Sequence, residues 1–355
     1  MAREVDVVVV GGGITGVATL RALARTGASV VLLEQLELGH ARGSSHGESR
    51  IFRLSYPDPT YTRLAQEGLA SWRVLEKESG ERLIVHTGSL DAGDAAVATE
   101  RSLAGAGAGY EIVDGDSVRR RWPLAFEPGE RLVFQPAGGY IRADVAYGVL
   151  AAGARAAGGE VVELARVIRI DAGDDGVVVA TAADEISAGA VVVAAGAWAR
   201  DLLATVGIGL AVVPTRETVS YFAFPGADEL PAVIEYPSAA SPLPDGQAYY
   251  ALPAPGRGLK AGIHHSGLPT DPEQEGIPDD GVVAATAAWV ARRFPEADPA
   301  PPAAETCIYT NTADESFVVE AHGRVVVASA CSGHGFKFAP LLGERIATLA
   351  LVAGT

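Results

Sequence analysis

The N-terminal part of the chain carries apolar and glycine-rich runs in an order that predicts a strand, a tight turn, a helix and a second strand. Val5–Val10 is a β-branched run, typical of a strand that is buried on both faces. Residues 11–16 are rich in glycine, and Ala and Leu then recur with helical spacing over residues 17–25. A second apolar run covers residues 29–33 and ends at Glu34.

The rest of the chain mixes helical and strand patterns. Apolar residues recur with helical spacing over residues 60–78, 145–157, 282–294 and 342–352. Short apolar runs predict strands at residues 160–167, 176–182, 190–195 and 325–329. Residues 83–140 and 213–265 show short strand and loop patterns, which indicates a second lobe. A chain of 355 residues is also too long for one small domain.

Charge and composition exclude two classes of partner. The formal net charge is −16, and an acidic chain repels phosphate backbones, so we expect no nucleic-acid partner. No uncharged apolar run approaches about 18 residues, so we expect no membrane partner. The only cysteines are Cys307 and Cys331, which fits a reducing compartment and predicts a cytoplasmic protein.

The glycines of the first turn match the dinucleotide fingerprint G-x-G-x-x-G. Gly11 allows the tight turn, Gly13 lets a pyrophosphate approach the backbone, and Gly16 permits close packing of helix on strand. Glu34 lies 23 residues after Gly11, where a carboxylate binds ribose hydroxyls and repels a 2′-phosphate. The pattern therefore predicts FAD or NAD rather than NADP. The fingerprint residues expected to contact the nucleotide are Gly11, Gly13, Ile14, Thr15 and Gly16.

Three further segments resemble one family. They are residues 45–53 (SHGESRIFR), 307–310 (CIYT) and 332–338 (SGHGFKF). Together with the fingerprint they resemble monomeric sarcosine oxidase and N-methyltryptophan oxidase, which are FAD-dependent amine oxidases of the D-amino acid oxidase superfamily. The resemblance covers roughly the whole chain and implies that the nucleotide is FAD.

The resemblance also implies the fold. We expect an α/β, two-lobe (α+β) architecture in which a Rossmann-like FAD-binding domain of the glutathione-reductase/p-hydroxybenzoate-hydroxylase type carries an inserted antiparallel-sheet substrate domain. The FAD-binding domain is expected to be discontinuous, over residues 1–82, 141–212 and 305–355. The substrate-binding domain is expected over residues 83–140 and 213–304.

The resemblance assigns a set of residues to the cofactor. Cys307 is implied to be the point where FAD is attached covalently, through a thioether. Because attachment needs a thiolate, we expect a nearby cation to lower the pKa of Cys307. Cys331 lacks this context and is expected to be a core thiol, and no metal site is expected. The other FAD contacts expected are His46, Arg53, Val167, Gly196, Trp198, Gly333, Gly335 and Lys337.

A second set of residues is implied to handle the substrate and oxygen. Arg50 and Lys337 resemble the pair of cations that holds a substrate carboxylate, which would orient the reacting C–H bond. Lys260 resembles the lysine that activates O2, because a cation stabilises superoxide-like charge. The other active-site and pocket residues expected are His264, Tyr250 and Tyr309.

Two positions depart from the family pattern or fall outside it. Glu48 stands where the family often has Asp, and the longer side chain could alter the approach to the flavin or to Arg50. His265 has no family counterpart and is expected to be a polar neighbour whose hydrogen bonds are satisfied.

The function implied is that of an oxidase acting on a secondary-amine amino acid, such as sarcosine or another N-methyl or cyclic amino acid. A hydride would pass to flavin N5 and leave an imine, and O2 would then reoxidise the flavin and give hydrogen peroxide. We expect a monomer whose partners are a small amino acid and O2. Three alternatives stay open: a dehydrogenase with another electron acceptor, a flavin-binding subunit without turnover, and an NAD enzyme.

Overall fold

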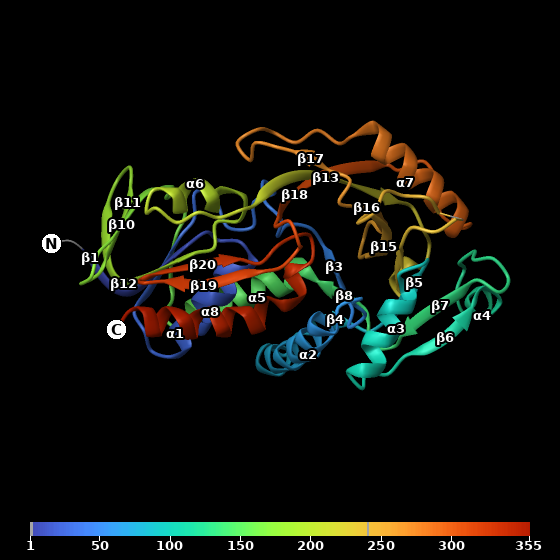
Figure 1. The fold of residues 1–355 in the computed structure, drawn as a ribbon, viewed down its shortest axis with the longest axis horizontal. Coiled ribbons are helices and arrows are strands. Elements are labelled where there is room, and N and C mark those ends of the chain that lie inside the picture. Colours follow the sequence, from blue (N-terminus) through green and yellow to red (C-terminus); the bar gives the residue numbers. More distant parts are fainter. Residues whose placement is uncertain (1–2, 240) are drawn as a thin grey trace.

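The molecule is built around two large β-sheets that lie towards opposite ends of its long axis (Figure 1). The computed structural model describes residues 3–239 and 241–355. One sheet has eight strands and the other nine, and a third, smaller sheet has three strands. The predicted α/β fold with a second lobe is confirmed. No helix of the described ranges is both long and apolar enough to cross a membrane.

The eight-stranded sheet has a parallel centre. In spatial order its strands are β10 (Val167–Ala172), β11 (Val177–Thr181), β12 (Glu185–Val193), β1 (Arg3–Val10), β2 (Val30–Leu33) and β9 (Glu160–Val162), with β20 (Val325–Ser329) beside β12 and β19 (Val318–His322) beside β20. β9, β2, β1, β12 and β20 run parallel, whereas β10, β11 and β19 are antiparallel to their neighbours. The strands predicted at residues 5–10, 29–33 and 325–329 are confirmed.

Both faces of this sheet are covered, which explains the unbroken valine run of β1. Three helices pack on one face: α1 (Ile14–Arg25), α5 (Ala143–Ala156) and α8 (Ala339–Ala353) (Figure 1). Val7 and Val9 belong to the apolar core on this side. Val8 and Val10 belong to the core on the opposite side, with α6 (Ala199–Ala204) and the β10–β11 hairpin. A strand buried on both faces needs no polar alternation.

The nine-stranded sheet forms the second part. In spatial order it contains β17 (Leu268–Pro269), β13 (Val213–Phe222), β16 (Gly258–His264), β15 (Ala248–Ala254), β14 (Ala232–Glu235), β5 (Ser89–Ala92), β7 (Arg131–Gln135) and β6 (Glu111–Asp114), with β18 (Ala303–Asn311) beside β13. Neighbouring strands are antiparallel except β14 and β5. α7 (Asp280–Arg293) packs on this sheet, and its buried Arg293 donates from Nη2 to Glu235 at 2.6 Å.

The three-stranded sheet connects the two parts. It contains β3 (Ser49–Phe52), β8 (Gly139–Arg142) and β4 (Ile84–Val85). β3 carries Arg50 and leads towards α2 (Pro59–Ser79), which Asp58 caps by accepting a hydrogen bond from Thr60 N at 2.7 Å. Three short 3₁₀ segments complete the chain: η1 (Gly196–Trp198), η2 (Ala227–Glu229) and η3 (Gly335–Phe338).

Two sequence-based predictions of local structure are wrong. The strand predicted at residues 160–167 is two strands, β9 and β10, because Leu164 between them has a positive φ of 57° that no strand allows. Two helices lie inside the region predicted as strands and loops, α3 (Ala96–Gly105) and α4 (Gly115–Arg121). α3 begins without a capping side chain. Asp114 caps α4 by accepting a hydrogen bond from Ser117 N, but α4 has only 7 residues, too few to show a helical period.

Candidate active site

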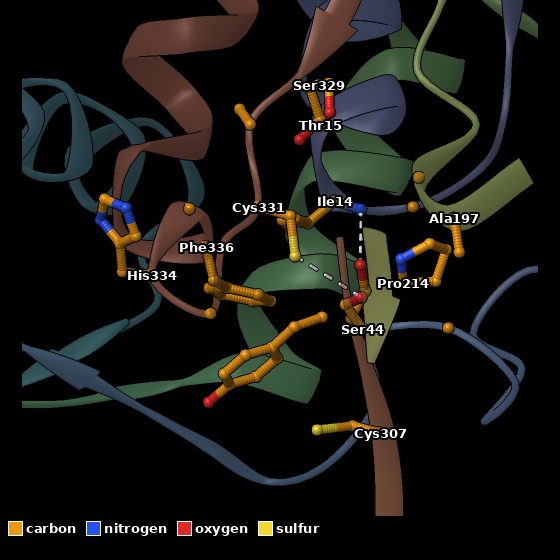
Figure 2. Close-up of a pocket in the computed structure, with 18 of the residues that line it drawn as sticks. Ile14, Thr15, Ser44, Ala197, Pro214, Cys307, Ser329, Cys331, His334 and Phe336 are labelled. Atoms are coloured by element: carbon orange, nitrogen blue, oxygen red, sulfur yellow. Dashed lines mark hydrogen bonds between the residues drawn. The ribbon is translucent and has the colours of Figure 1, made fainter. Parts of the chain in front are cut away.

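A single large cavity, with a volume of about 1750 Å³, brings the predicted site residues together. It is lined by segments of both large sheets and of β3, and Figure 2 shows the part between Ile14, Cys331 and Cys307. Gly16 is the one predicted site residue that does not line it. The predicted site residues on its wall are Gly11, Gly13, Ile14, Thr15, Glu34, His46, Arg50, Arg53, Val167, Gly196, Trp198, Tyr250, Lys260, His264, Cys307, Tyr309, Gly333, Gly335 and Lys337.

The glycine turn between β1 and α1 leaves no room for side chains. Gly11 has a φ of +103°, and a Cβ added there would lie 2.5 Å from the carbonyl oxygen of Ala194 on the neighbouring strand segment. A Cβ on Gly16 would lie 1.9 Å from the carbonyl oxygen of Gly11. These contacts are the tight turn and the close helix–strand packing that the fingerprint predicts.

Polar side chains hold this turn in place. Ser45 Oγ accepts a hydrogen bond from Ile14 N at 2.9 Å, at the start of α1. Glu34, buried at the end of β2, accepts from Gly12 N at 2.6 Å. Tyr147 of α5 donates its hydroxyl hydrogen to Gly12 O at 2.6 Å. Glu34 therefore lies beside the glycine turn, and its contact with a ribose stays a prediction.

Arg50, Lys260 and His46 form one cluster on the cavity wall. The Lys260 ammonium is buried and donates to Ser49 O at 3.4 Å. Burial, and then the nearby Arg50 guanidinium, lower the pKa of Lys260 to about 7. Burial, with Arg50 and Lys260, also lowers the pKa of His46 to about 4, and His46 Nδ1 is buried without a hydrogen-bond partner among the described residues. At neutral pH, His46 is thus a neutral ring with an unused polar atom.

Cys307 lies on β18 beside this cluster. Burial raises the pKa of the Cys307 thiol to about 11, although Arg50 and Lys260 act to lower it. The expected cations are therefore present, but the expectation of a lowered pKa is wrong in this structure, because desolvation outweighs their charge. Attachment of FAD at Cys307 stays a prediction.

Lys337 and Arg53 form a second cluster. Lys337 is buried, and its Nζ donates to the Tyr56 hydroxyl at 2.7 Å and to His334 O at 2.9 Å. Burial and the charge of Arg53 lower the pKa of Lys337 well below its usual value. Arg53 Nη1 binds the buried carboxylate of Asp91 at 2.8 Å. The cluster carries two cations but only one carboxylate among these side chains.

The cationic side chains lie near different partners from those predicted, because the motifs paired Arg50 with Lys337. The structure brings Lys337 together with Arg53, and it brings Arg50 together with Lys260. Both pairs face the same cavity. Arg50 and Arg53 lie three positions apart around β3, so the sequence motif alone did not distinguish which of them accompanies Lys337.

His264, Tyr309 and Tyr250 line the same cavity as the two clusters. His264 Nδ1 lies 3.4 Å from the Tyr309 hydroxyl. Burial, and then neighbouring cationic groups, lower the pKa of His264 well below its usual value, while burial raises the pKa of Tyr309 and of Tyr250. A Cβ on Gly333 would lie 2.3 Å from the Tyr309 ring and 2.7 Å from the His264 ring. Gly333 therefore leaves the space that these rings occupy.

Glu48 makes no hydrogen bond or ion pair with Arg50 in the described part of the chain, and its effect on the approach to the flavin stays a prediction. Its carboxylate accepts from Arg257 Nη1 at 3.2 Å, and the same nitrogen donates to Glu305 at 2.7 Å. The Arg257 guanidinium carbon lies 3.4 Å from the centroid of the Tyr221 ring. The longer Glu side chain is part of a partly exposed charge cluster beside the Lys260 side of the cavity.

The remaining predicted contacts lie at the rim or in the turn that follows β20. Val167 begins β10, and Trp198 of η1 donates from Nε1 to Glu273 at 3.2 Å. Gly196 has a φ of +51°. A Cβ on Gly335 would lie 1.7 Å from a backbone oxygen, so a packing constraint accounts for this glycine.

Sequence reasoning missed several residues that shape the cavity. Cys331 was expected to be a core thiol, but it is partly exposed on the cavity wall (Figure 2). Its Sγ accepts a hydrogen bond from Thr310 N at 3.4 Å. Tyr56, Tyr147 and Tyr236 also line the cavity. No sequence signal separates such tyrosines from core tyrosines. Ser45 was quoted within a motif, but its contact with α1 depends on tertiary structure.

Comparison with known proteins supports the resemblance drawn from the motifs. A family model described as FAD dependent oxidoreductase matches residues 6–349. The chain is 31% identical to the monomeric sarcosine oxidase of Bacillus sp. (strain B-0618), over 100% of this chain and 94% of that protein. It is 30% identical to the N-methyl-L-tryptophan oxidase of Yersinia pestis (strain Pestoides F), over 98% of this chain and 95% of that protein. The predicted resemblance is confirmed.

A solved structure has the same fold. A mutant of NikD, an unusual amino acid oxidase essential for nikkomycin biosynthesis, superposes in its open form with a TM-score of 0.89 and 28% identity. The match covers 98% of this chain and 94% of that chain. The two-part architecture is thus that of a known amino acid oxidase.

Replacing Gly16 with Ala tests the glycine turn. The added Cβ would overlap the carbonyl oxygen of Gly11, so we expect Gly16→Ala to cost about 1–3 kcal/mol of stability and to reduce bound FAD. Flavin absorbance per protein and the denaturation midpoint measure both effects. Gly148→Ala, in an exposed part of α5 where a Cβ meets nothing within 4 Å, is the control and should be neutral or stabilising. Equal behaviour of the two variants would contradict the packing account.

Proposed function

The chain belongs to the family of FAD-dependent oxidoreductases, and we propose that it is an oxidase of secondary-amine amino acids, such as sarcosine or another N-methyl or cyclic amino acid. The observation that carries this proposal is the single cavity that joins the glycine turn to two separate groups of buried cations. One group, Lys337 with Arg53, suits a carboxylate. The other, Lys260 with Arg50, suits the charge that forms on oxygen.

The residues of the glycine turn and the wall beside it fit FAD. Gly11 and Gly16 make the close backbone turn. The N-cap of α1 is Gly13, which has no side chain to cover the N-terminus, and Ser45 Oγ binds the first N–H group of the helix, that of Ile14, so we propose that the following N–H groups face the phosphates. The buried, unpartnered His46 Nδ1 fits a cofactor that supplies its hydrogen bond. We propose that the FAD-binding part corresponds to residues 1–82, 141–212 and 305–355 and the substrate part to 83–140 and 213–304. β18 crosses this division, because it carries Cys307 yet pairs with β13.

Lys337 and Arg53 are proposed to hold the substrate carboxylate. Arg53 pairs with the buried Asp91 carboxylate, whereas the buried Lys337 makes no ion pair within the described part of the chain. Lys337 uses its ammonium for Tyr56 and His334, and a third N–H is free for a ligand. A carboxylate bound there would restore the charged form of Lys337 and fix one end of the substrate. His264, Tyr250 and Tyr309 would then shape the space around the amine.

Lys260 is proposed to supply a positive charge on the oxygen side. FAD held in the cavity would supply a flavin that can take a hydride from the amine and pass two electrons to O2, which with two protons gives hydrogen peroxide. Lys260 and Arg50 place positive charge in a buried wall where negative charge would develop, and such charge is worth more there than in water. His46 adds no charge at neutral pH.

We further propose that the protein acts as a cytoplasmic monomer. Its net charge of −16 argues against a nucleic-acid partner, and its two cysteines, which form no disulfide, suit a reducing compartment. Its partners would be the small amino acid and O2.

Oxygen uptake with a panel of amines tests the proposed function. Sarcosine, N-methyl amino acids, pipecolate and proline should be compared with glycine, and at least one secondary amine should consume O2 and form an equal amount of peroxide. Turnover of a secondary amine with an artificial acceptor but without peroxide would overturn the oxidase assignment in favour of a dehydrogenase. Absence of flavin reduction by every amine would overturn catalysis itself.

The pH dependence of reoxidation tests Lys260. Because its pKa is lowered to about 7, Lys260 loses its charge as pH rises through 7, so the rate constant of the reduced enzyme with O2 should fall over that range. Lys260→Arg should keep a high rate that does not change with pH, since Arg stays charged. Lys260→Met should be slow at all pH values, with flavin reduction much less affected. The exposed Lys77→Met is the control and should follow the wild-type profile. Equal losses in both half-reactions of Lys260→Met would contradict this role.

Acid precipitation tests the attachment at Cys307. The wild-type pellet should stay yellow, because a thioether survives acid, whereas Cys307→Ser should release all its flavin into the supernatant. Cys331→Ser is the matched control, since Cys331 lines the same cavity, and its pellet should stay yellow. Release of flavin from the wild type, or a yellow pellet of Cys307→Ser, would show that Cys307 carries no flavin.

A further inference from the structure

Three side chains with metal-binding atoms lie together at the edge of the cavity. His264 ends β16, His265 follows it, and Glu315 comes from the turn after β18. One ligand atom of each residue lies within 4.8 Å of those of the other two. The two imidazole rings have their centroids 4.0 Å apart, and His264 and Glu315 both line the cavity.

The backbone and the hydrogen bonds at this cluster are unusual. His265 has a φ of 56° and Glu315 a φ of 60°, a region that costs a residue with a side chain about 1–2 kcal/mol. Within residues 3–239 and 241–355, the buried His265 Nε2 has no hydrogen-bond partner, and it lies 3.5 Å from a Glu315 carboxylate oxygen. The expectation that His265 is a satisfied polar neighbour is thus wrong. Strained backbone and an unpartnered buried nitrogen are features that persist where a ligand uses them.

We propose that His264, His265 and Glu315 form a binding site for a divalent transition metal ion, best matched by Zn²⁺. Zn²⁺ prefers imidazole nitrogen and carboxylate oxygen, and it often takes three protein ligands while a fourth position stays open. With bonds of about 2.0–2.1 Å, tetrahedral ligand atoms lie about 3.4 Å apart. The observed spacing reaches that geometry by small movements, and the Glu315 side chain, 48% exposed, is free to make them.

The surrounding charges limit the affinity. Arg53 and Lys337 act electrostatically on His264, and their positive charge opposes a dication. The Glu315 carboxylate offsets part of this repulsion. We therefore expect a site that is filled at micromolar Zn²⁺ rather than a permanently occupied structural site.

Occupation of the site would affect the proposed reaction. A metal ion held by His264 and Glu315 would stand on the wall of the cavity that the amine enters, next to the carboxylate-binding cations. Zn²⁺ should therefore inhibit turnover. This inhibition rests on the proposed function, whereas the binding of the ion does not.

Calorimetric titration of the flavin-loaded protein with Zn²⁺ tests the site. We expect one ion per chain, and His265→Asn and Glu315→Gln should each weaken binding by about tenfold or more because each removes a ligand. His265→Asn also suits the backbone, since Asn tolerates positive φ better than most residues. Retained flavin absorbance shows that each variant is folded. His322→Ala is the matched control, because His322 forms an exposed pair with Glu320 at 2.8 Å, away from the proposed site. This variant should bind Zn²⁺ as tightly as the wild type.

The outcomes separate this proposal from the proposed function. Absence of Zn²⁺ binding by the wild type, or equal affinity of His265→Asn and the wild type, would overturn the site. If the wild type and His322→Ala lose amine oxidation in Zn²⁺ while His265→Asn keeps it, both the site and its effect on turnover are supported. If no amine is oxidised at all, the proposed function fails, and the titration still decides the metal site.

Discussion

The desolvation of two lysine ammonium groups in one cavity is the constraint on which the rest of the site depends. Lys260 is 7% exposed and Lys337 is 6% exposed, and neither makes an ion pair with the described part of the chain. A buried cation without a counter-ion is costly, and here the cost appears as a lowered pKa for both groups. Such groups favour the binding of an anion. In the function proposed above, these anions would be a substrate carboxylate at Lys337 and reduced oxygen at Lys260.

The fold brings these cations together from distant parts of the chain. Lys260 lies on β16 of the nine-stranded sheet, and Lys337 lies in η3, which follows the last parallel strand of the other sheet. β3 contacts elements of both parts. Arg50 within β3 and Arg53 directly after it lie near the two lysines. The cavity therefore exists only when both sheets are packed together, and its chemistry is a property of the whole chain.

The sequence predicted those features that depend on local rules. The glycine turn, its strand and its helix follow from backbone sterics at Gly11 and Gly16, and motifs located the cations. Three-dimensional neighbours were not predictable in the same way. Which arginine accompanies Lys337, and whether cations or desolvation dominate at Cys307, depend on side-chain directions and burial that only the packed structure fixes. α3 and α4 escaped prediction because they lack a clear start signal or sufficient length.

The central claim is that buried cations select an amine that carries a carboxylate. Anaerobic reduction of the bound flavin tests this claim most directly. Sarcosine and dimethylamine present the same secondary amine, but only sarcosine carries a carboxylate. We predict that an N-methyl amino acid bleaches the wild-type flavin far faster than its decarboxylated counterpart, and that Lys337→Met loses this preference while the exposed Lys77→Met keeps it. Equal bleaching by both amines in the wild type, or an unchanged preference in Lys337→Met, would contradict the account.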